Sequence, residues 1–297
     1  MKPDMDMEKC ELEVLISTFG SEGLRRVVSM GLPVLPGVGY LVSCQCPGRE
    51  SLPIPAELMR PDIRIVFSAT QGLSVNRNNA IRHASAPFCL IADDDLRYSP
   101  AGLSKIISFF RDHPDVDIAT FAYTDSWGKF EKSYAGNKFP LDTPSKGYFV
   151  SSIEIAFRRE RVVATGVTFN ERFGLGCQVY GSGEEELWVK DLLDAGLEGY
   201  FVPVVIARHI GPSSTGLRRA ASPAVLRAQG AVIKRLYPYT AFMRILLKAR
   251  RASKENEVSI GECLPPLLYG WWHATVNPRK LFGSRPRKLF SSHENEG

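Results

Sequence analysis

Three consecutive aspartates, Asp93, Asp94 and Asp95, are the residues of this sequence that point most directly to chemistry. They follow the apolar or small residues 88–92, a run typical of a strand that is buried on both faces. Aspartates at the carboxyl end of such a strand lie where open α/β sheets bind ligands. Because adjacent carboxylates repel one another, the triplet suits Mg²⁺ or Mn²⁺ carried by a diphosphate. The alternative interpretation is a solvated acidic turn.

Arg77 and a run of three glutamates are two further sets of candidate functional residues. Arg77 begins a predicted helix just before the acidic strand, where its guanidinium suits either a phosphate or the aspartates. Glu184, Glu185 and Glu186 open another predicted helix, directly after Gly-Ser-Gly. Carboxylates in a first helical turn complement the helix dipole, which is one interpretation of them. The other is a general base that takes a proton from an attacking hydroxyl, since glycines let a ligand come close.

His209 and the polar segment 17–22 complete the candidate residues. His209 follows the last predicted strand and precedes a Gly-Pro turn. A single histidine is commonly structural, but this one is expected at the same sheet edge as the aspartates. The glycine-containing segment 17–22 ends the first predicted strand and also reaches that edge.

The elements that must position these residues alternate between strands and helices. This alternation predicts an α/β fold with a doubly wound, mostly parallel sheet. Strands are predicted at 12–18, 40–46, 63–67, 88–92, 116–122, 152–158 and 200–207, and helices at 22–30, from Ser74, from Pro100 and from Glu184 to a stop at Gly196.

Several details of these elements are open to test. Ser74 is expected to cap its helix, with Val75, Ala80, Ile81 and Ala84 on a modest apolar face. The alternation in 152–158 predicts a half-buried strand, and Pro203 predicts a sheet edge or a bulge. The long segment 124–150 is rich in glycine, proline and aromatic residues. Its aromatic side chains either stack on a sugar ring or fill a local core.

Composition sets limits on the protein class. The chain has 297 residues, 44% of them hydrophobic and 23% charged, as in ordinary globular proteins. Its six cysteines form no C-x-x-C pair, which predicts reduced thiols of a cytoplasmic protein. The start of the chain is acidic and lacks the apolar core of a signal peptide. No apolar run approaches ~20 residues, so no membrane span is predicted.

Charge is concentrated near the end of the chain. Twelve Lys or Arg and three Glu lie between Lys234 and Phe290, a local charge of +9, whereas the whole chain carries +5. We therefore expect a catalytic domain over 1–236 and a basic amphipathic extension over 237–297. The extension, with Trp271 and Trp272 near basic residues, suits an anionic membrane on its cytoplasmic face. One alternative is a solvated basic tail with no dedicated partner, and another is that the amphipathic and Trp-containing segments pack back onto the catalytic domain. Nucleic acid is not expected as a partner.

In order and spacing, four motifs together resemble the family 2 glycosyltransferases of the GT-A fold, and most of all the bacterial members that build surface polysaccharides. They are LISTFGSEG, GLSVNRNNAIRHASAPFCLIADDD, GSGEEELWVKDLLDAG and VVIARHIGPSSTG. The resemblance covers roughly residues 12–216. The second motif is the most specific because it joins the R-N-N helix to the apolar strand and the aspartates.

The resemblance implies a role for each candidate residue. Those implied to bind the nucleotide-sugar donor are Ser17, Thr18, Phe19, Glu22, Arg77, Asn78, Asp93 and Asp94. Asp95 and His209 are implied as ligands of Mn²⁺ or Mg²⁺. Glu185, next to Glu184, takes the position of the catalytic base.

The implied activity is an inverting transfer of a sugar from a nucleotide diphosphate, with a UDP-sugar preferred, to a hydroxyl of a glycan or lipid-linked acceptor. A base and a metal suffice for such a displacement. The alternatives are a nucleotidyltransferase of related fold and a non-catalytic carbohydrate-binding protein. The first is disfavoured because 17–23 lacks a basic, glycine-rich phosphate loop.

Overall fold

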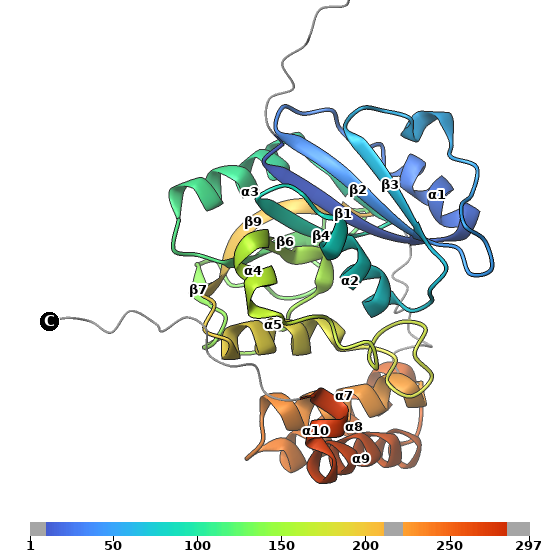
Figure 1. Ribbon diagram of the computed structural model, residues 1–297. Coiled ribbons are helices and arrows are strands. Elements are labelled where there is room, and N and C mark those ends of the chain that lie inside the picture. Colours follow the sequence, from blue (N-terminus) through green and yellow to red (C-terminus); the bar gives the residue numbers. More distant parts are fainter. Residues whose placement is uncertain (1–9, 211–221, 284–297) are drawn as a thin grey trace, which may run out of the picture. The chain divides into compact units, whose positions relative to one another are not determined.

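The computed structural model describes residues 10–210 and 222–283 (Figure 1). They form two compact units. Of the described residues, the sheet unit contains 10–71, 76–164 and 197–210, and the helical unit contains 72–75, 165–196 and 222–283. Residues 211–216 of the last motif, and Arg285, Arg287 and Lys288 of the basic extension, lie outside the described residues.

The strands and helices agree closely with the predicted alternation. In chain order they are β1 (Leu12–Phe19), α1 (Gly20–Ser29), β2 (Val38–Gln45), η1 (Ala56–Leu58), β3 (Ile63–Ser68), α2 (Leu73–His83), β4 (Phe88–Asp93), β5 (Leu96–Tyr98), α3 (Pro100–Asp112), β6 (Ile118–Thr124), β7 (Phe139–Pro140), η2 (Ser152–Glu154), β8 (Ile155–Arg158), α4 (Arg159–Thr165), α5 (Glu184–Asp194), β9 (Gly199–His209), α7 (Pro223–Leu236), α8 (Ala241–Asn256), α9 (Ile260–Val276) and α10 (Pro278–Phe282).

One sheet runs through the first unit, in the strand order β3-β2-β1-β4-β8-β6-β9-β5, with β7 paired to β9 (Figure 1). The strands β3, β2, β1 and β4 are mutually parallel, as are β6 and β9. The short strands β5, β7 and β8 pair antiparallel. The predicted α/β class with a mostly parallel sheet is therefore confirmed. The strand order reverses between β1 and β4, the kind of point where such sheets bind ligands.

The faces of the sheet follow from the alternation of side chains along β1. Leu12, Val14 and Ile16 belong to a core cluster shared with the apolar stripes of α1 and α3. Glu13 and Ser17 point to the opposite face because successive side chains alternate. The stripe of α3 holds Leu103, Ile106, Ile107 and Phe110, all buried as the sequence predicts.

Helix α2 differs from the prediction in how it begins and in what it buries. Ser74 lies inside the helix, so the predicted cap is wrong, and its Oγ donates to the carbonyl oxygen of Phe173 at 2.6 Å. Of the predicted apolar face, Ala80 and Ala84 are buried, whereas Val75 and Ile81 are only half-buried. The rest of the buried face is polar: Asn76, Arg77, Asn78 and Asn79. Tertiary hydrogen bonds, which the apolar pattern cannot reveal, replace hydrophobic packing on this side of the sheet.

Two strand predictions require correction, and one holds. The segment 152–158 is not a single half-buried strand, because a 3-10 turn precedes β8, and Ile155, Ala156 and Phe157 are all fully buried. Strand β6 starts at Ile118, two residues later than predicted. The register between β6 and β9 shifts next to Pro203, as expected of a proline that cannot donate to the ladder. Pro203 thus marks an irregularity inside the sheet and not an edge.

Half of the aromatic residues of 124–150 build a local core. Tyr134 and Phe139 stack on Phe201 of β9, with ring centroids 5.6 and 4.9 Å apart, and Tyr148 packs on the same ring at 5.2 Å. Trp127 remains 85% exposed. Phe130 and Phe149 are also exposed, so the interpretation as a local core holds for three of the six aromatic residues of this segment.

The helical unit is built around the pair α7 and α9, with α8 and α10 beside α9 (Figure 1). Gly230 and Gly270 let these two helices touch, since a Cβ at Gly270 would lie 1.9 Å from the carbonyl oxygen of Arg227. Helix α8 is amphipathic and basic, as predicted, and buries Ala241 and Ile245 with two further alanines. None of the described helices is both long enough and apolar enough to cross a bilayer. All six cysteines are free.

Candidate functional site

The carboxyl ends of β1 and β4 meet at the reversal point of the sheet. Ser17 pairs with Asp93 across the two strands, and the hydroxyl of Thr18 donates to the carboxylate of Asp94. A Cβ at Gly23 of α1 would lie only 2.0 Å from Thr18 Oγ1, so a glycine is needed for the helix to approach this pair. Parallel pairing thus brings together two motifs that lie about 75 residues apart in the chain.

Arg26 is a member of this cluster that the sequence did not single out. Its Nε and Nη2 donate to the two carboxylate oxygens of Asp94 at 3.0 and 2.8 Å. This bidentate pair fixes the orientation of the carboxylate and offsets one of the three negative charges. In the sequence, Arg26 is one of several polar residues on an amphipathic helix. Only the packing of α1 on β1 and β2, next to the end of β4, reveals its partner.

Arg77 neutralises the first aspartate of the triplet. Its Nη2 lies 3.0 Å from Asp93 Oδ1 and 2.8 Å from Ser152 Oγ, and only 1% of Arg77 is exposed. Burial raises the pKa of Asp93, and the nearby guanidinium opposes this shift. Of the two partners expected for Arg77, the structure shows the aspartate.

A buried network of amides holds the base of the cluster. The side-chain amide of Asn76 donates to the carbonyl oxygens of Thr18 and Ser43, each at 3.0 Å. Ser43 Oγ in turn donates to Asn76 Oδ1 and accepts from Asn79. Asn76 therefore fixes the end of β1, a role the sequence did not indicate. Asn78, expected near the donor, is 93% buried on the same helix.

Asp95 and His209 meet at the other end of the triplet, where β5 pairs with β9. His209 Nε2 lies 3.1 Å from Asp95 Oδ2, and His209 Nδ1 lies 3.1 Å from Glu131 Oε1. The hydrogen bond to Asp95 is the main cause that raises the pKa of His209 to about 9, and Glu131 adds to it, whereas burial opposes it. Glu131 lies in the loop after β6 and was not anticipated from the sequence.

The residues around Asp95 fit a hard cation. Asp95 Oδ1 is buried and has no hydrogen-bond partner within 10–210 and 222–283, and an imidazole lies next to the same carboxylate. Among the described residues, no group of three or more His, Cys, Asp and Glu side chains forms a metal cage. Mg²⁺ and Mn²⁺ do not need one, since they are commonly held by one or two carboxylates together with substrate phosphates.

The remaining residues of the first loop differ in their surroundings. Phe19, at the end of β1, is 48% exposed, so one face of its ring is available to a ligand. Ser17 is buried, and its Oγ has no hydrogen-bond partner in the described part of the chain. Glu22 is exposed on α1 and pairs with Arg25 at 3.0 Å. Its expected contact with a donor stays a prediction.

The acidic helix start belongs to the helical unit. Gly183, with φ of +82°, precedes α5 in a left-handed conformation that favours glycine. Glu184 is buried, and its carboxyl lies so close to Gly174 that a Cβ there would stand 3.0 Å away. Glu185 and Glu186 are half-buried. Of the two predicted candidates for the base, Glu185 is the one that solvent reaches more easily.

Sequence comparison gives a family match for part of the chain. Residues 50–170, from before β3 to the loop after α4, match the sequence model of glycosyl transferase family 2. This segment, 121 of the 297 residues, is therefore similar to a family 2 glycosyltransferase domain. Its activity is therefore that of a glycosyltransferase, which favours the transferase prediction over the nucleotidyltransferase and the non-catalytic alternatives. No curated protein sequence shows significant similarity to the chain.

Solved structures support the fold of this glycosyltransferase. The crystal structure of S. aureus TarS 1-349 shares 15% sequence identity and superposes with a TM-score of 0.55 over 91% of this chain and 73% of that one. A second S. aureus TarS structure gives 0.56 at 15% identity, over 87% of this chain and 55% of that one. The structure of S. aureus TarS 1-349 in complex with UDP-GlcNAc gives a TM-score of 0.55 at 15% identity, over 87% of this chain and 90% of that one. The GT-A fold implied by the sequence is thus confirmed.

Proposed function

We propose that this glycosyltransferase moves a sugar from a nucleotide-diphosphate sugar to a hydroxyl of a glycan or lipid-linked acceptor, with inversion at the anomeric carbon. The observation that carries the proposal is the gathering of Thr18, Arg77, the three aspartates and His209 at one edge of the sheet. A UDP-sugar is the favoured donor, supported by the UDP-GlcNAc complex of the similar TarS structure.

Asp95 and His209 are the proposed ligands of Mn²⁺ or Mg²⁺, with the unpartnered Asp95 Oδ1 as the first donor atom. When bound, such a cation acts as a Lewis acid and offsets the charge that develops on the leaving diphosphate. Arg26 and Arg77 hold Asp94 and Asp93 in fixed orientations before any donor arrives. Preorganised groups of this kind stabilise a transition state without reorganisation during the reaction.

Glu185 is the proposed general base. A hydroxyl is a weak nucleophile, and a carboxylate within hydrogen-bond reach can accept its proton as it attacks. Glu185 suits this role because it is half-buried at the start of α5, whereas Glu184 is buried against Gly174. A single base is sufficient for direct displacement, which inverts the anomeric configuration. The proton leaves the acceptor oxygen as the bond to the anomeric carbon forms.

An anionic membrane is the proposed surface for the helical unit. Helix α8 exposes Met243 (61%) and Leu247 (65%) on the side away from its buried alanines. Basic side chains flank them, and α8 carries five Lys or Arg against one Glu. Apolar side chains between cations are typical of helices that lie in a membrane interface. Such a location would bring the enzyme to a lipid-linked acceptor.

The proposal is tested by thermal unfolding with UDP, GDP, CDP and dTDP, each with and without Mn²⁺. At ~100 times its dissociation constant a nucleotide should add about 2.7 kcal/mol of stability. We expect UDP with Mn²⁺ to stabilise the wild type and Asp95→Ala to lose this effect. Asp112→Ala, an exposed aspartate at the end of α3, is the matched control. A wild type that responds to no nucleotide would contradict the donor site.

The base is tested by release of UDP from UDP-GlcNAc, with water or an acceptor taking the sugar. Glu185→Gln should lower the rate roughly 10²- to 10⁴-fold, the usual contribution of a general base, with UDP affinity unchanged. Glu184→Gln and Glu186→Gln are the neighbouring controls. If Glu186→Gln alone removes activity, the register of the base is different. The anomeric configuration of the first product, read by NMR, decides whether transfer inverts.

A further inference from the structure

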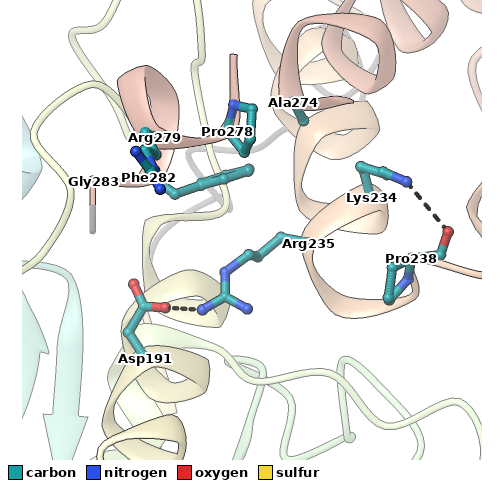
Figure 2. Close-up of a pocket in the computed structure, with 9 residues that line it drawn as sticks. All are labelled: Asp191, Lys234, Arg235, Pro238, Ala274, Pro278, Arg279, Phe282 and Gly283. Carbon is teal, nitrogen blue, oxygen red and sulfur yellow. Dashed lines mark hydrogen bonds and ion pairs between the residues drawn. The ribbon is translucent and has the colours of Figure 1, made fainter. Parts of the chain in front are cut away.

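A cavity of about 540 Å³ lies within the helical unit, at the end of α7 and beside α9 and α10 (Figure 2). Its volume falls within the range of ordinary ligand pockets. Three cationic side chains line it, Lys234, Arg235 and Arg279, against one carboxylate, Asp191. The wall therefore carries a net charge of +2. None of these residues takes part in the proposed donor or metal site.

Arg235 is the fixed cation of the wall. Its Nη2 donates to Asp191 (Figure 2). The same nitrogen donates to Asp194 at 2.8 Å, so two carboxylates of α5 orient the guanidinium. Both hydrogen bonds come from one nitrogen of the guanidinium, Nη2. Within residues 10–210 and 222–283, Nε and Nη1 of Arg235 donate to no other group. Arg235 is thus preorganised and retains donor capacity for a ligand.

Lys234 and Arg279 are the two other cationic side chains of the wall. Lys234 makes one long contact, 3.4 Å from Nζ to the carbonyl oxygen of Pro238. No ion pair or hydrogen bond of the Arg279 side chain occurs in the described part of the chain. These three cations line one cavity with one wall carboxylate, and Asp194, which also pairs with Arg235, leaves a local charge of +1. An anion in the cavity offsets this excess positive charge and forms charge-assisted hydrogen bonds.

The rest of the wall is apolar. The ring of Phe282 and the ring of Pro238 border the cavity, together with Pro278 and Ala274 (Figure 2). A simple inorganic anion would leave these carbon atoms facing water. A ligand that combines an acidic group with a compact body, such as a sugar ring whose C–H face packs on an aromatic or proline ring, satisfies both parts of the wall.

We propose that this cavity binds an acidic sugar residue, one that carries a phosphate or a carboxylate, of the acceptor glycan. The identification of the ligand as part of the acceptor rests on the proposed function. The binding of an acidic sugar rests only on the wall of the cavity. The acceptor of this glycosyltransferase is thereby an anionic glycan.

The test is isothermal titration calorimetry of the full chain with glucose 6-phosphate and glucuronate, with glucose and inorganic phosphate as reference ligands. At least one acidic sugar should bind, glucose should not, and inorganic phosphate should bind more weakly. Arg279→Ala should weaken the binding of the acidic sugar roughly tenfold or more, the usual effect of losing a charge-assisted hydrogen bond. Arg279 is exposed, so this variant should keep its melting temperature.

Arg250→Ala is the matched control, because it removes the same charge from an exposed position on α8 outside the cavity. Equal weakening by the two variants would overturn the proposal and indicate non-specific attraction. So would an acidic sugar that binds no better than inorganic phosphate. Flotation with phosphatidylglycerol vesicles is the last arm. Loss of flotation by Arg279→Ala, with no sugar binding in the wild type, would assign the cavity to a lipid headgroup and overturn the glycan assignment.

The two proposals fail separately. If UDP and Mn²⁺ stabilise the protein but no acidic sugar binds, only the proposal of an anionic acceptor is contradicted. If an acidic sugar binds through Arg279 but no nucleotide does, the proposed function is lost, and with it the identification of the ligand as an acceptor.

Discussion

His209 Nδ1 lies 3.1 Å from Glu131 Oε1, so a residue of the loop after β6 holds the ring whose other nitrogen faces Asp95. A carboxylate in this position fixes the orientation of an imidazole and, when the other nitrogen binds a metal, raises its strength as a ligand. Glu131 is therefore a positioning residue for the proposed metal site.

Removing the charge of Glu131 should weaken metal binding without removing a ligand. We expect Glu131→Gln to lower Mn²⁺ affinity about 10- to 100-fold, as is typical when the partner of a ligating histidine is altered. Electron paramagnetic resonance of free Mn²⁺ measures this directly. Glu57→Gln, an exposed glutamate of η1, is the control. Equal affinity in both variants would show that His209 needs no such partner.

The stability of the metal-free protein should depend on the protonation of His209. Its pKa in the folded protein is raised to about 9, above the ordinary value of about 6.5 in an unfolded chain. The resulting stabilisation is full below about pH 6.5 and disappears as the pH rises through 9. In EDTA, the free energy of unfolding of the wild type relative to His209→Gln should therefore decrease between pH 6.5 and 9.5. A difference that does not change across this range would contradict the raised pKa.

A buried ion pair fastens the same loop to the sheet. Lys132 Nζ lies 2.8 Å from Glu154 Oε2, and the two side chains are 5% and 0% exposed. Lys132→Met leaves an uncompensated buried carboxylate and should cost roughly 3–5 kcal/mol in urea unfolding. The double variant Lys132→Met/Glu154→Gln should recover most of that loss. Lys129→Met, at an exposed position, should have little effect. A double variant as unstable as the single one would contradict this explanation.

The contact between α7 and α9 should not accept a methyl group. Gly270→Ala places a Cβ 1.9 Å from the carbonyl oxygen of Arg227 and must push the helices apart. Overpacking of this kind costs about 1–3 kcal/mol, measured as a lower midpoint of unfolding. At Gly261 of the same helix, the nearest atom to a Cβ is 3.7 Å away. Gly261→Ala should therefore be neutral or slightly stabilising.

The exposed apolar side chains of α8 should govern binding to anionic vesicles. The double variant Met243→Ser/Leu247→Ser should reduce the bound fraction in flotation by ~10-fold or more, since each buried methylene contributes about 0.8 kcal/mol. Val34→Ser/Met59→Ser, at positions 75% and 70% exposed in the sheet unit, is the control. If both double variants float equally well, α8 is not the membrane contact.

Much of the sheet could be predicted because its signals are local. The apolar run 88–92 predicts β4 without knowledge of its neighbours, and the stripe Leu103, Ile106, Ile107 and Phe110 predicts α3. Each of these patterns indicates which side chains are buried. The spacing of the buried side chains then indicates whether the segment is a strand or a helix. Helix α2 shows where this reasoning stops. Its buried face is polar, and hydrogen bonds to β1 and β2 replace the apolar contacts that a pattern can reveal.

The sequence by itself determined the fold class and the acidic triplet at the end of a buried strand. Only the tertiary structure decided the partners of that triplet: Arg26 on Asp94, Arg77 on Asp93, and His209 with Glu131 next to Asp95. The physical reason is separation along the chain. These partners lie between 16 and 114 residues from the residues they contact. No local pattern specifies such a pair, because the order of strands in the sheet and the packing of helices on it bring the two side chains together.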